Sequence, residues 1–108
     1  MSALLAQIQN LAARGEVEIS RHGFKELAAD DISIQDVLAG VPAAEVIEEY
    51  PDYFKGPAIM TLQRDGAGKP IHLLWGVPAG QSKPAVLVTA YRPDRVRWED
   101  DWRTRRRT

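Results

Sequence analysis

The chain has 108 residues, of which 44% are apolar and 27% charged, with no cysteine and a formal net charge of −1. This size predicts one domain with a single modest core, and the lack of cysteine excludes disulfides, thiolate metal sites and a cysteine nucleophile. No apolar run approaches the roughly 20 residues that span a bilayer, and the N-terminus lacks the positive segment of a signal peptide, so we expect a cytoplasmic protein with no membrane partner.

Charge is divided unevenly along the chain. Residues 1–54 carry ten acidic side chains against three basic ones, whereas residues 55–108 carry five acidic side chains against eleven basic ones. Such asymmetry can mark a half that binds a polyanion. It is also typical of two halves that attract each other or of a solvated surface. We favour this second explanation, because Glu99-Asp100-Asp101 interrupts the basic run.

The N-terminal half predicts three helices and a short strand. Apolar residues recur at helical spacing within residues 1–15, and Gly15 ends that helix. Residues 17–19 alternate as a strand. Ser20 can cap a second helix over residues 21–29, and Ser33 opens a third helix that ends at Gly40.

From Glu45 onward the apolar period changes from helical to alternating. Strands are predicted over residues 45–50, 58–63, 71–77 and 85–91, with Asp65-Gly66-Ala67-Gly68 as a hairpin loop. Consecutive strands joined by short turns favour an antiparallel meander. Helices first and strands after predict an α+β fold, with N-terminal helices packed on one face of a four-stranded, mostly antiparallel sheet.

Two histidines are the candidates for proton transfer. His22 lies at the start of the second helix, and His72 lies in a strand on the face opposite Ile71 and Leu73. Imidazole is the side chain whose ordinary pKa suits acid–base chemistry near neutrality. Two histidines that meet in one cleft could therefore cleave RNA without a metal. The alternative is that each histidine is structural or merely exposed.

The last predicted strand ends in Tyr91-Arg92-Pro93 and leads into an arginine-rich C-terminus. Arg92 could hold a phosphate, with Arg95 and Lys25 as further cations, and Tyr91 could stack on a base or donate a proton. The alternative is that Tyr91 caps the core and Arg92 faces solvent. Trp75 lies in the apolar register and is predicted to be core. The four-residue spacing of Trp98 and Trp102 predicts a short helix that packs both rings on the sheet.

Neither a metal nor a cofactor is expected. The two histidines are far apart in the sequence and lack the spacing of a ligand set. Glycine-rich phosphate loops and serine-hydrolase motifs are likewise absent from the sequence.

Several segments occur together in an order that resembles a known family. They are Ile19-Ser20-Arg21-His22, Ile32-Ser33 through Val37, Val46 to Pro51, Pro70-Ile71-His72 and Thr89 to Pro93. Over residues 17–98 the chain resembles a small bacterial domain-of-unknown-function family grouped with RelE/ParE-like and BrnT-like toxins. The resemblance implies helices on a curved antiparallel sheet of RelE/ParE-like type, with residues 99–108 as a basic tail. It also implies kinship with mRNA-cleaving toxins, with His22, His72, Tyr91 and Arg92 as the polar site.

The chain departs from this family at two positions. Members usually carry an Arg-Met pair four residues after the first histidine and a further arginine shortly after it. Here these positions are Glu26-Leu27 and Asp30, so two cations are missing where a phosphate would lie.

Two classes of function follow from these residues. The first is a metal-independent ribonuclease or its inactive relative, in which His22 and His72 exchange protons, Tyr91 assists and Arg92 holds the phosphate. The second is a non-enzymatic module, which binds either an antitoxin-like protein or, through the arginines from Arg92 to Arg107, RNA without cutting it. A homo-oligomer is compatible with both.

Overall fold

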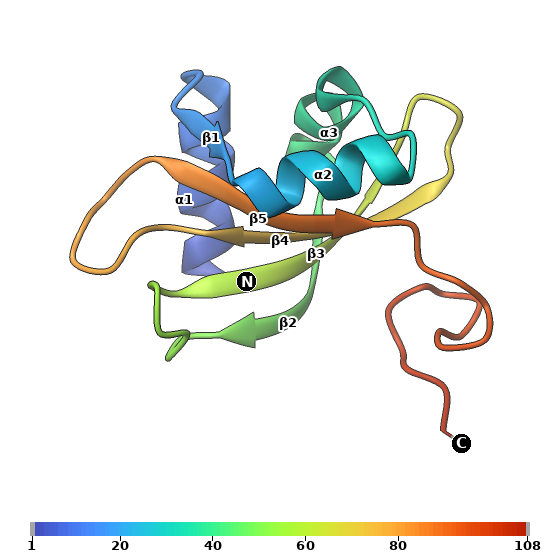
Figure 1. Cartoon of the computed structure of the whole chain (residues 1–108). Helices are drawn as coiled ribbons and strands as arrows, with labels where there is room; N and C mark the ends of the chain where they lie inside the picture. The colour runs from blue at the N-terminus through green and yellow to red at the C-terminus, as the bar shows by residue number, and fades with distance from the viewer. Residues whose placement is uncertain (1, 108) are drawn as a thin grey trace.

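The computed structural model describes residues 2–107 and shows an α+β chain with three α-helices and a five-stranded sheet (Figure 1). The helices are α1 (Ala3–Ala13), α2 (Arg21–Ala29) and α3 (Ile34–Gly40), followed by a short 3-10 turn (Val41–Ala43). The strands are β1 (Val17–Ile19), β2 (Glu45–Tyr50), β3 (Ala58–Arg64), β4 (Pro70–Gly76) and β5 (Ala85–Tyr91). The predicted positions of these elements are confirmed, with small differences at their ends.

A serine caps the start of each α-helix. The side chains of Ser2, Ser20 and Ser33 each accept a hydrogen bond from the backbone N–H three residues further on. These caps satisfy amide groups that have no partner inside the helix. The predicted caps at Ser20 and Ser33 are therefore confirmed.

The sheet has five strands in the order β1-β5-β4-β3-β2, so the prediction of four strands is wrong. Strands β2 to β5 form the predicted antiparallel meander, whereas β1 pairs in parallel with β5, from Val17 opposite Ala85 to Ile19 opposite Leu87. The sheet is therefore mixed. Local alternation identified residues 17–19 as a strand but carried no information about a partner at the far end of the chain.

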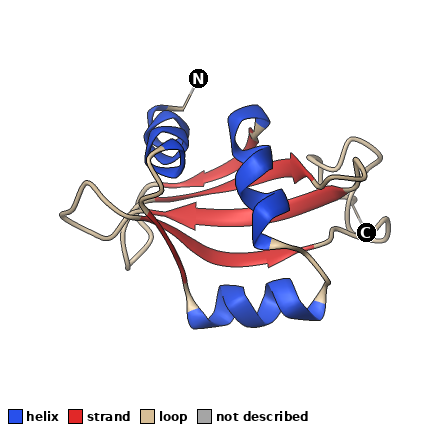
Figure 2. Cartoon of the chain, turned by 90° about the horizontal axis from the view of Figure 1, so that it is seen from above, coloured by secondary structure: helices blue, strands red, loops and turns tan. Residues whose placement is uncertain are grey.

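The three helices pack on the sheet to different extents. The core includes residues from all three helices and one face of the sheet, among them Ile8, Leu27, Val37, Ile71 and Trp75. Figure 2 shows α3 crossing over the strands, whereas α2 flanks the sheet at its margin. There α2 runs beside β5 (Figure 1), and a Cβ on Gly23 would lie 2.8 Å from the Leu87 carbonyl oxygen. The absence of a side chain at Gly23 allows this close approach.

A polar network lies inside the core. The Gln63 Oε1 atom accepts hydrogen bonds from Thr61 Oγ1 and Trp75 Nε1, each at 3.1 Å, while Gln63 Nε2 donates to the Val37 carbonyl at 2.9 Å. Trp75 is 1% exposed, which confirms that it is a core residue. Across residues 2–107, no buried side-chain nitrogen or oxygen lacks a hydrogen-bond partner. The network links β3 and β4 to α3 without leaving an uncompensated polar group.

Gly56 holds the loop between β2 and β3 against the end of β4. Its φ is +130°, and a Cβ at this position would lie 2.1 Å from the Val77 carbonyl oxygen. Backbone hydrogen bonds from Val77 to Pro57 and from Ala79 to Lys55 keep the two segments in contact. No residue with a side chain fits here unless the two segments separate.

Replacing Gly56 with alanine is expected to lower the free energy of unfolding by about 3 kcal/mol, because backbone strain adds to a clash with a main-chain oxygen. Gly68→Ala is the matched control. Gly68 also has a positive φ, +80°, but no atom lies within 4 Å of the added Cβ. The control should lose only about 1 kcal/mol. Urea denaturation measures both losses, and equal losses would contradict the close contact at Gly56.

Candidate functional site

His72 and Tyr91 lie side by side on the sheet face opposite the core. His72 of β4 is the register partner of Tyr91 in β5 and of Leu62 in β3. Directly opposed residues of neighbouring strands project from the same face. These three side chains therefore point away from Ile71 and Leu73, which are core residues.

The C-terminal segment, defined here as residues 93–107, folds back over this face. Trp98 is 2% exposed, and its ring meets the His72 ring edge-on with the centroids 4.4 Å apart. The Trp102 carbonyl oxygen lies 2.6 Å from His72 Nε2. The segment therefore forms a cover over His72. Thr108, the last residue of the predicted tail, lies outside the described residues.

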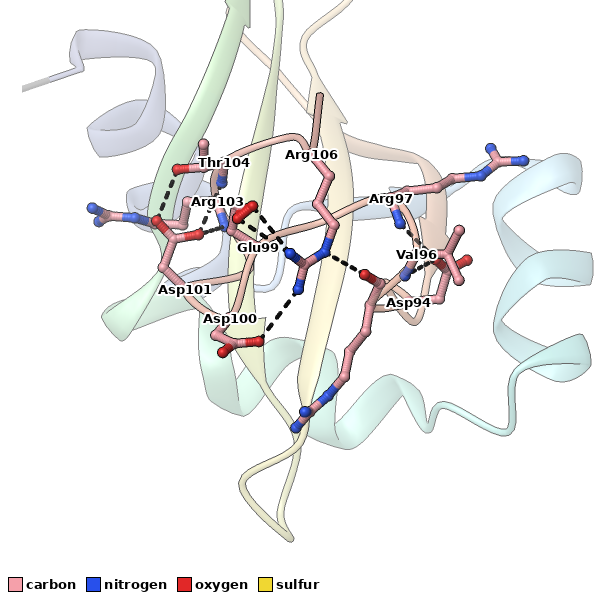
Figure 3. Close-up of polar contacts among 10 residues, drawn as sticks. Asp94, Val96, Arg97, Glu99, Asp100, Asp101, Arg103, Thr104 and Arg106 are labelled. Atoms are coloured by element: carbon pink, nitrogen blue, oxygen red, sulfur yellow. Dashed lines mark hydrogen bonds and ion pairs between the residues drawn. The ribbon is translucent and has the colours of Figure 1, made fainter. Parts of the chain in front are cut away.

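The C-terminal segment is built from turns, so the prediction of a helix through Trp98 and Trp102 is wrong. Figure 3 shows Asp94 and Asp101 each accepting hydrogen bonds from two backbone amides. These local bonds offer the backbone an alternative to helical pairing. Trp102 also has a φ of +61°, which is incompatible with a right-handed helix.

Ion pairs join the C-terminal segment to β2. Arg103 lies 3.2 Å from Glu45, and Arg105 lies 2.7 Å from Glu48. These contacts agree with the preferred explanation of the charge asymmetry, in which the acidic and basic halves attract each other. Exposed pairs of this kind each contribute at most about 1 kcal/mol. The burial of Trp98 is therefore the stronger anchor of the segment.

His72 is enclosed and has both ring nitrogens engaged. It is 0% exposed. Because Nε2 faces the Trp102 carbonyl, we assign the ring proton to Nε2, which donates to that oxygen. Nδ1 then accepts a hydrogen bond from the Tyr91 hydroxyl at 3.0 Å. Burial lowers the pKa of His72 below its ordinary value. The residue is therefore a neutral imidazole that positions Tyr91.

Tyr91 forms one wall of a pocket beside the C-terminal segment. The pocket has a volume of about 260 Å³ and is lined by Tyr91, Arg92, Asp94, Arg97, Trp98 and Arg105. Burial raises the pKa of the Tyr91 hydroxyl. The hydroxyl consequently stays protonated at neutral pH, and its single proton is the one donated to His72 Nδ1.

The lining of this pocket, called here the Tyr91 pocket, is predominantly cationic. Its lining residues include three arginines and one acidic residue, Asp94. Arg92 and Arg105 each also pair with a carboxylate outside the lining. Arg97 has no ion-pair partner among residues 2–107. The arrangement is suited to an anion that accepts hydrogen bonds from the Arg97 guanidinium.

Arg92, predicted to hold a phosphate, is also a structural clamp. Its Nε donates to the Asp30 carbonyl at 3.1 Å, its Nη1 contacts the Asp65 carboxylate at 2.9 Å, and its Nη2 donates to the Asp31 carbonyl at 3.3 Å. Its backbone N–H donates to the Asp30 carboxylate at 2.8 Å. Asp30 thus has a structural role in this chain. The backbone amide of Lys69 and the Arg92 guanidinium hold the pKa of Asp65 below its usual value.

The structure does not gather the other predicted site residues around Tyr91. The His22 side chain is 65% exposed in the first turn of α2, with Nε2 3.6 Å from Glu26 Oε1. Lys25 is exposed on the same helix. Neither residue lines the Tyr91 pocket. Arg95 stands over the Trp102 ring, 5.8 Å from its centroid, and is also absent from the lining. Because His72 is enclosed, no cleft is shared by the two histidines.

The sequence predicted RNA binding through residues 92–107 as a whole but did not single out Arg97 or Arg105, and it predicted Trp98 on the sheet without its role as the cover of His72. The clustering of arginines after residue 91 was the available signal, but it did not show which of them would be paired. Within residues 2–107, no three histidine, aspartate or glutamate side chains are grouped to hold a metal ion. No helix in this range has the length and apolarity needed to traverse a bilayer.

Comparison with known protein families matches residues 19–92 to a domain of unknown function, DUF4258. The matched region includes His22, His72 and Tyr91 and ends at Arg92, so the C-terminal segment lies outside it. None of the comparisons connects the matched domain to RelE/ParE-like or BrnT-like toxins. Searches of the curated proteins and of the solved structures found no match.

Replacing Trp98 with alanine is expected to lower the free energy of unfolding by about 3 kcal/mol and to raise the pKa of His72, because water reaches the imidazole. Urea denaturation and an NMR titration of His72 measure the two effects. Val96→Ala, at a side chain that is 78% exposed, is the matched control. A folded Trp98→Ala protein with an unchanged His72 pKa would contradict the cover.

Stability is expected to fall as the pH drops below about 6.5, the ordinary pKa of histidine in the unfolded chain. The folded-state pKa of His72 lies lower, so below this pH the unfolded chain binds a proton that the folded chain does not. The free energy of unfolding therefore falls by up to about 1.4 kcal/mol for each pH unit. Urea midpoints between pH 5 and 8 measure this slope. His72→Gln should remove this dependence of stability on pH. His22→Gln is the control for loss of a histidine and should keep it. A slope that persists in His72→Gln would rule out His72 as its source.

Proposed function

Because the chain belongs to the DUF4258 family, whose function is unknown, we propose a function from its own geometry: it binds the phosphate backbone of single-stranded RNA without cutting it. The observation that carries this proposal is the Tyr91 pocket, which is lined by three arginines, a tyrosine and a single acidic residue. A phosphate needs this combination of positive charge and hydrogen-bond donors.

Arg97 is the cation most available to a phosphate, because the other two arginines share their charge with carboxylates. Arg105 also stands over the Trp98 ring, with its guanidinium carbon 4.7 Å from the centroid. The carboxylate in the lining, that of Asp94, is turned toward the backbone, where Oδ1 accepts from the amides of Val96 and Arg97.

Binding without cleavage follows from the protonation states. Cleavage of RNA through its 2′-hydroxyl needs one group that removes a proton and another that supplies one. His72 has no free nitrogen and no exposed surface. A raised pKa keeps Tyr91 protonated, so Tyr91 is unsuited to remove a proton at neutral pH. His22 lies outside the pocket lining.

A second candidate function is metal-independent RNA cleavage, as the resemblance to RelE/ParE-like toxins implies. It is favoured by the 3.0 Å contact between Tyr91 and His72, since Nδ1 could take the hydroxyl proton as Tyr91 takes a proton from the RNA 2′-hydroxyl. The resulting imidazolium would keep its Nε2 proton and return the Nδ1 proton through Tyr91 to the leaving 5′-oxygen. Kinship with these toxins belongs to this candidate and is supported by the order of sequence motifs.

Fluorescence anisotropy of a labelled single-stranded RNA at several salt concentrations tests the proposal. The native chain should bind with an affinity that falls as salt rises, because each neutralised phosphate releases counterions. Arg97→Gln should weaken binding several-fold and reduce the salt slope by about one. Arg21→Gln, at an exposed arginine outside the pocket, is the matched control and should bind like the native chain.

The same RNA incubated in EDTA distinguishes the two candidates. Intact RNA with salt-dependent binding supports the first candidate. Cleavage that disappears in both Tyr91→Phe and His72→Gln supports the second. Absence of salt-dependent binding, or equal binding by the native chain and Arg97→Gln, overturns the first.

A further inference from the structure

A second cleft opens at the other end of β4 and β5, apart from the Tyr91 pocket. It has a volume of about 280 Å³, and its apolar walls include Val77, Pro78, Val86 and Val88. The loop between β2 and β3 closes one side through Tyr53 and Lys55. No residue lines both cavities. The two cavities are therefore separate features of the fold.

The walls of this cleft, called here the Lys55 cleft, are held in place by the backbone. The Ala79 N–H donates to the Lys55 carbonyl at 3.0 Å, and the Val77 N–H donates to the Pro57 carbonyl at 3.2 Å. Gly76, with no side chain, leaves space between the walls, and a Cβ there would lie 3.8 Å from Val88 Cγ2. A cleft with fixed walls needs little rearrangement to accept a ligand.

Two polar groups at the cleft have no partner within residues 2–107. The Lys55 ammonium forms no ion pair there and lies 5.5 Å from the centroid of the exposed Phe54 ring. The Tyr53 hydroxyl has no hydrogen-bond partner among the side-chain contacts of that range, and its ring packs against Phe54 at 5.1 Å. Ser20, by contrast, already bonds to Gly23 and Val88.

The charge of the lining selects the ligand. Lys55 is the charged residue among the lining residues, and no acidic side chain accompanies it. Apolar walls with one cation favour a molecule that has an apolar body and one negative charge. The volume, about 280 Å³, lies just below the range of typical ligand pockets, which run from about 300 to 1,000 Å³, and so favours a body of about one ring.

We propose that the Lys55 cleft binds a small organic carboxylate whose body is a single aromatic ring or a branched aliphatic chain. The apolar body lies between the valine walls, and the carboxylate pairs with the Lys55 ammonium and accepts a hydrogen bond from the Tyr53 hydroxyl. This site is independent of RNA binding, because it shares no lining residue with the Tyr91 pocket.

Phenylacetate is the probe, with phenethylamine as a cation of similar shape. Each is titrated into the full chain labelled with ¹⁵N, and the amide resonances are followed by NMR. Phenylacetate should cause saturable shifts at Lys55, Gly76 and Val77, with a Kd on the order of 1 mM. Phenethylamine should cause much smaller shifts at the same amides, because its charge repels Lys55.

Two variants test the roles of the wall and the cation. Val86→Phe should abolish the phenylacetate shifts by filling the cleft. Lys55→Gln should weaken binding about fivefold through loss of one partly exposed ion pair. Lys69→Gln, at an exposed lysine in the β3–β4 hairpin, is the matched control and should bind like the native chain. The dispersion of the amide spectrum shows that each variant is folded, and Lys55→Gln remains informative if Val86→Phe does not fold.

Three outcomes overturn the proposal. The first is the absence of saturable shifts at the cleft with phenylacetate. The second is equal affinity of the native chain for phenylacetate and phenethylamine, or equal affinity of the native chain and the Lys55→Gln variant for phenylacetate. The third is a set of cleft resonances that move with protein concentration alone, which would show that a second copy, through its exposed Phe54, fills the cleft instead.

Discussion

The rest of the structure depends on the closure of β5 along both edges. One edge pairs with β4 in the antiparallel meander. The other edge is closed first by the parallel strand β1, then by Ser20, which bonds to the carbonyls of Leu87 and Val88, and finally by Asp30, which accepts the Arg92 amide. Unpaired strand edges leave polar groups without partners and invite foreign strands. Closing this edge places α2 at the margin of the sheet rather than over a face.

The same closure determines the direction in which the chain leaves β5. Arg92 is tied to the loop between α2 and α3 and to the hairpin between β3 and β4. The C-terminal segment therefore starts from a fixed point and turns across the face that the core does not use. Trp98 then covers His72, and burial lowers the pKa of the imidazole. Both ring nitrogens of this histidine are engaged, one by the Tyr91 hydroxyl and the other by the Trp102 carbonyl.

The open face of the sheet thus carries two different chemical environments at its two ends. The Tyr91 end is cationic because the basic C-terminal segment folds over it, and the segment also brings Arg97 and Arg105 to the pocket. The Lys55 end is apolar because Gly76, Val86 and Val88 remain uncovered by that segment. Both environments arise from a single event, the return of the chain over half of this face.

The sequence by itself determined the helices, the strands of the meander, the hairpin at Asp65 and the core position of Trp75. Each depends on interactions between residues close in the chain, such as a serine cap with an amide three residues on, or on the alternation of apolar side chains. Only the tertiary structure decided the parallel partner of β1, the marginal place of α2, the clamp at Arg92 and the cover formed by Trp98. These features depend on contacts between residues that are distant in the sequence, such as Asp30 with Arg92 and His72 with Trp102. A local pattern shows that a side chain is polar or charged, but its partner, and hence its pKa and its availability for chemistry, is set by the packing of the whole chain.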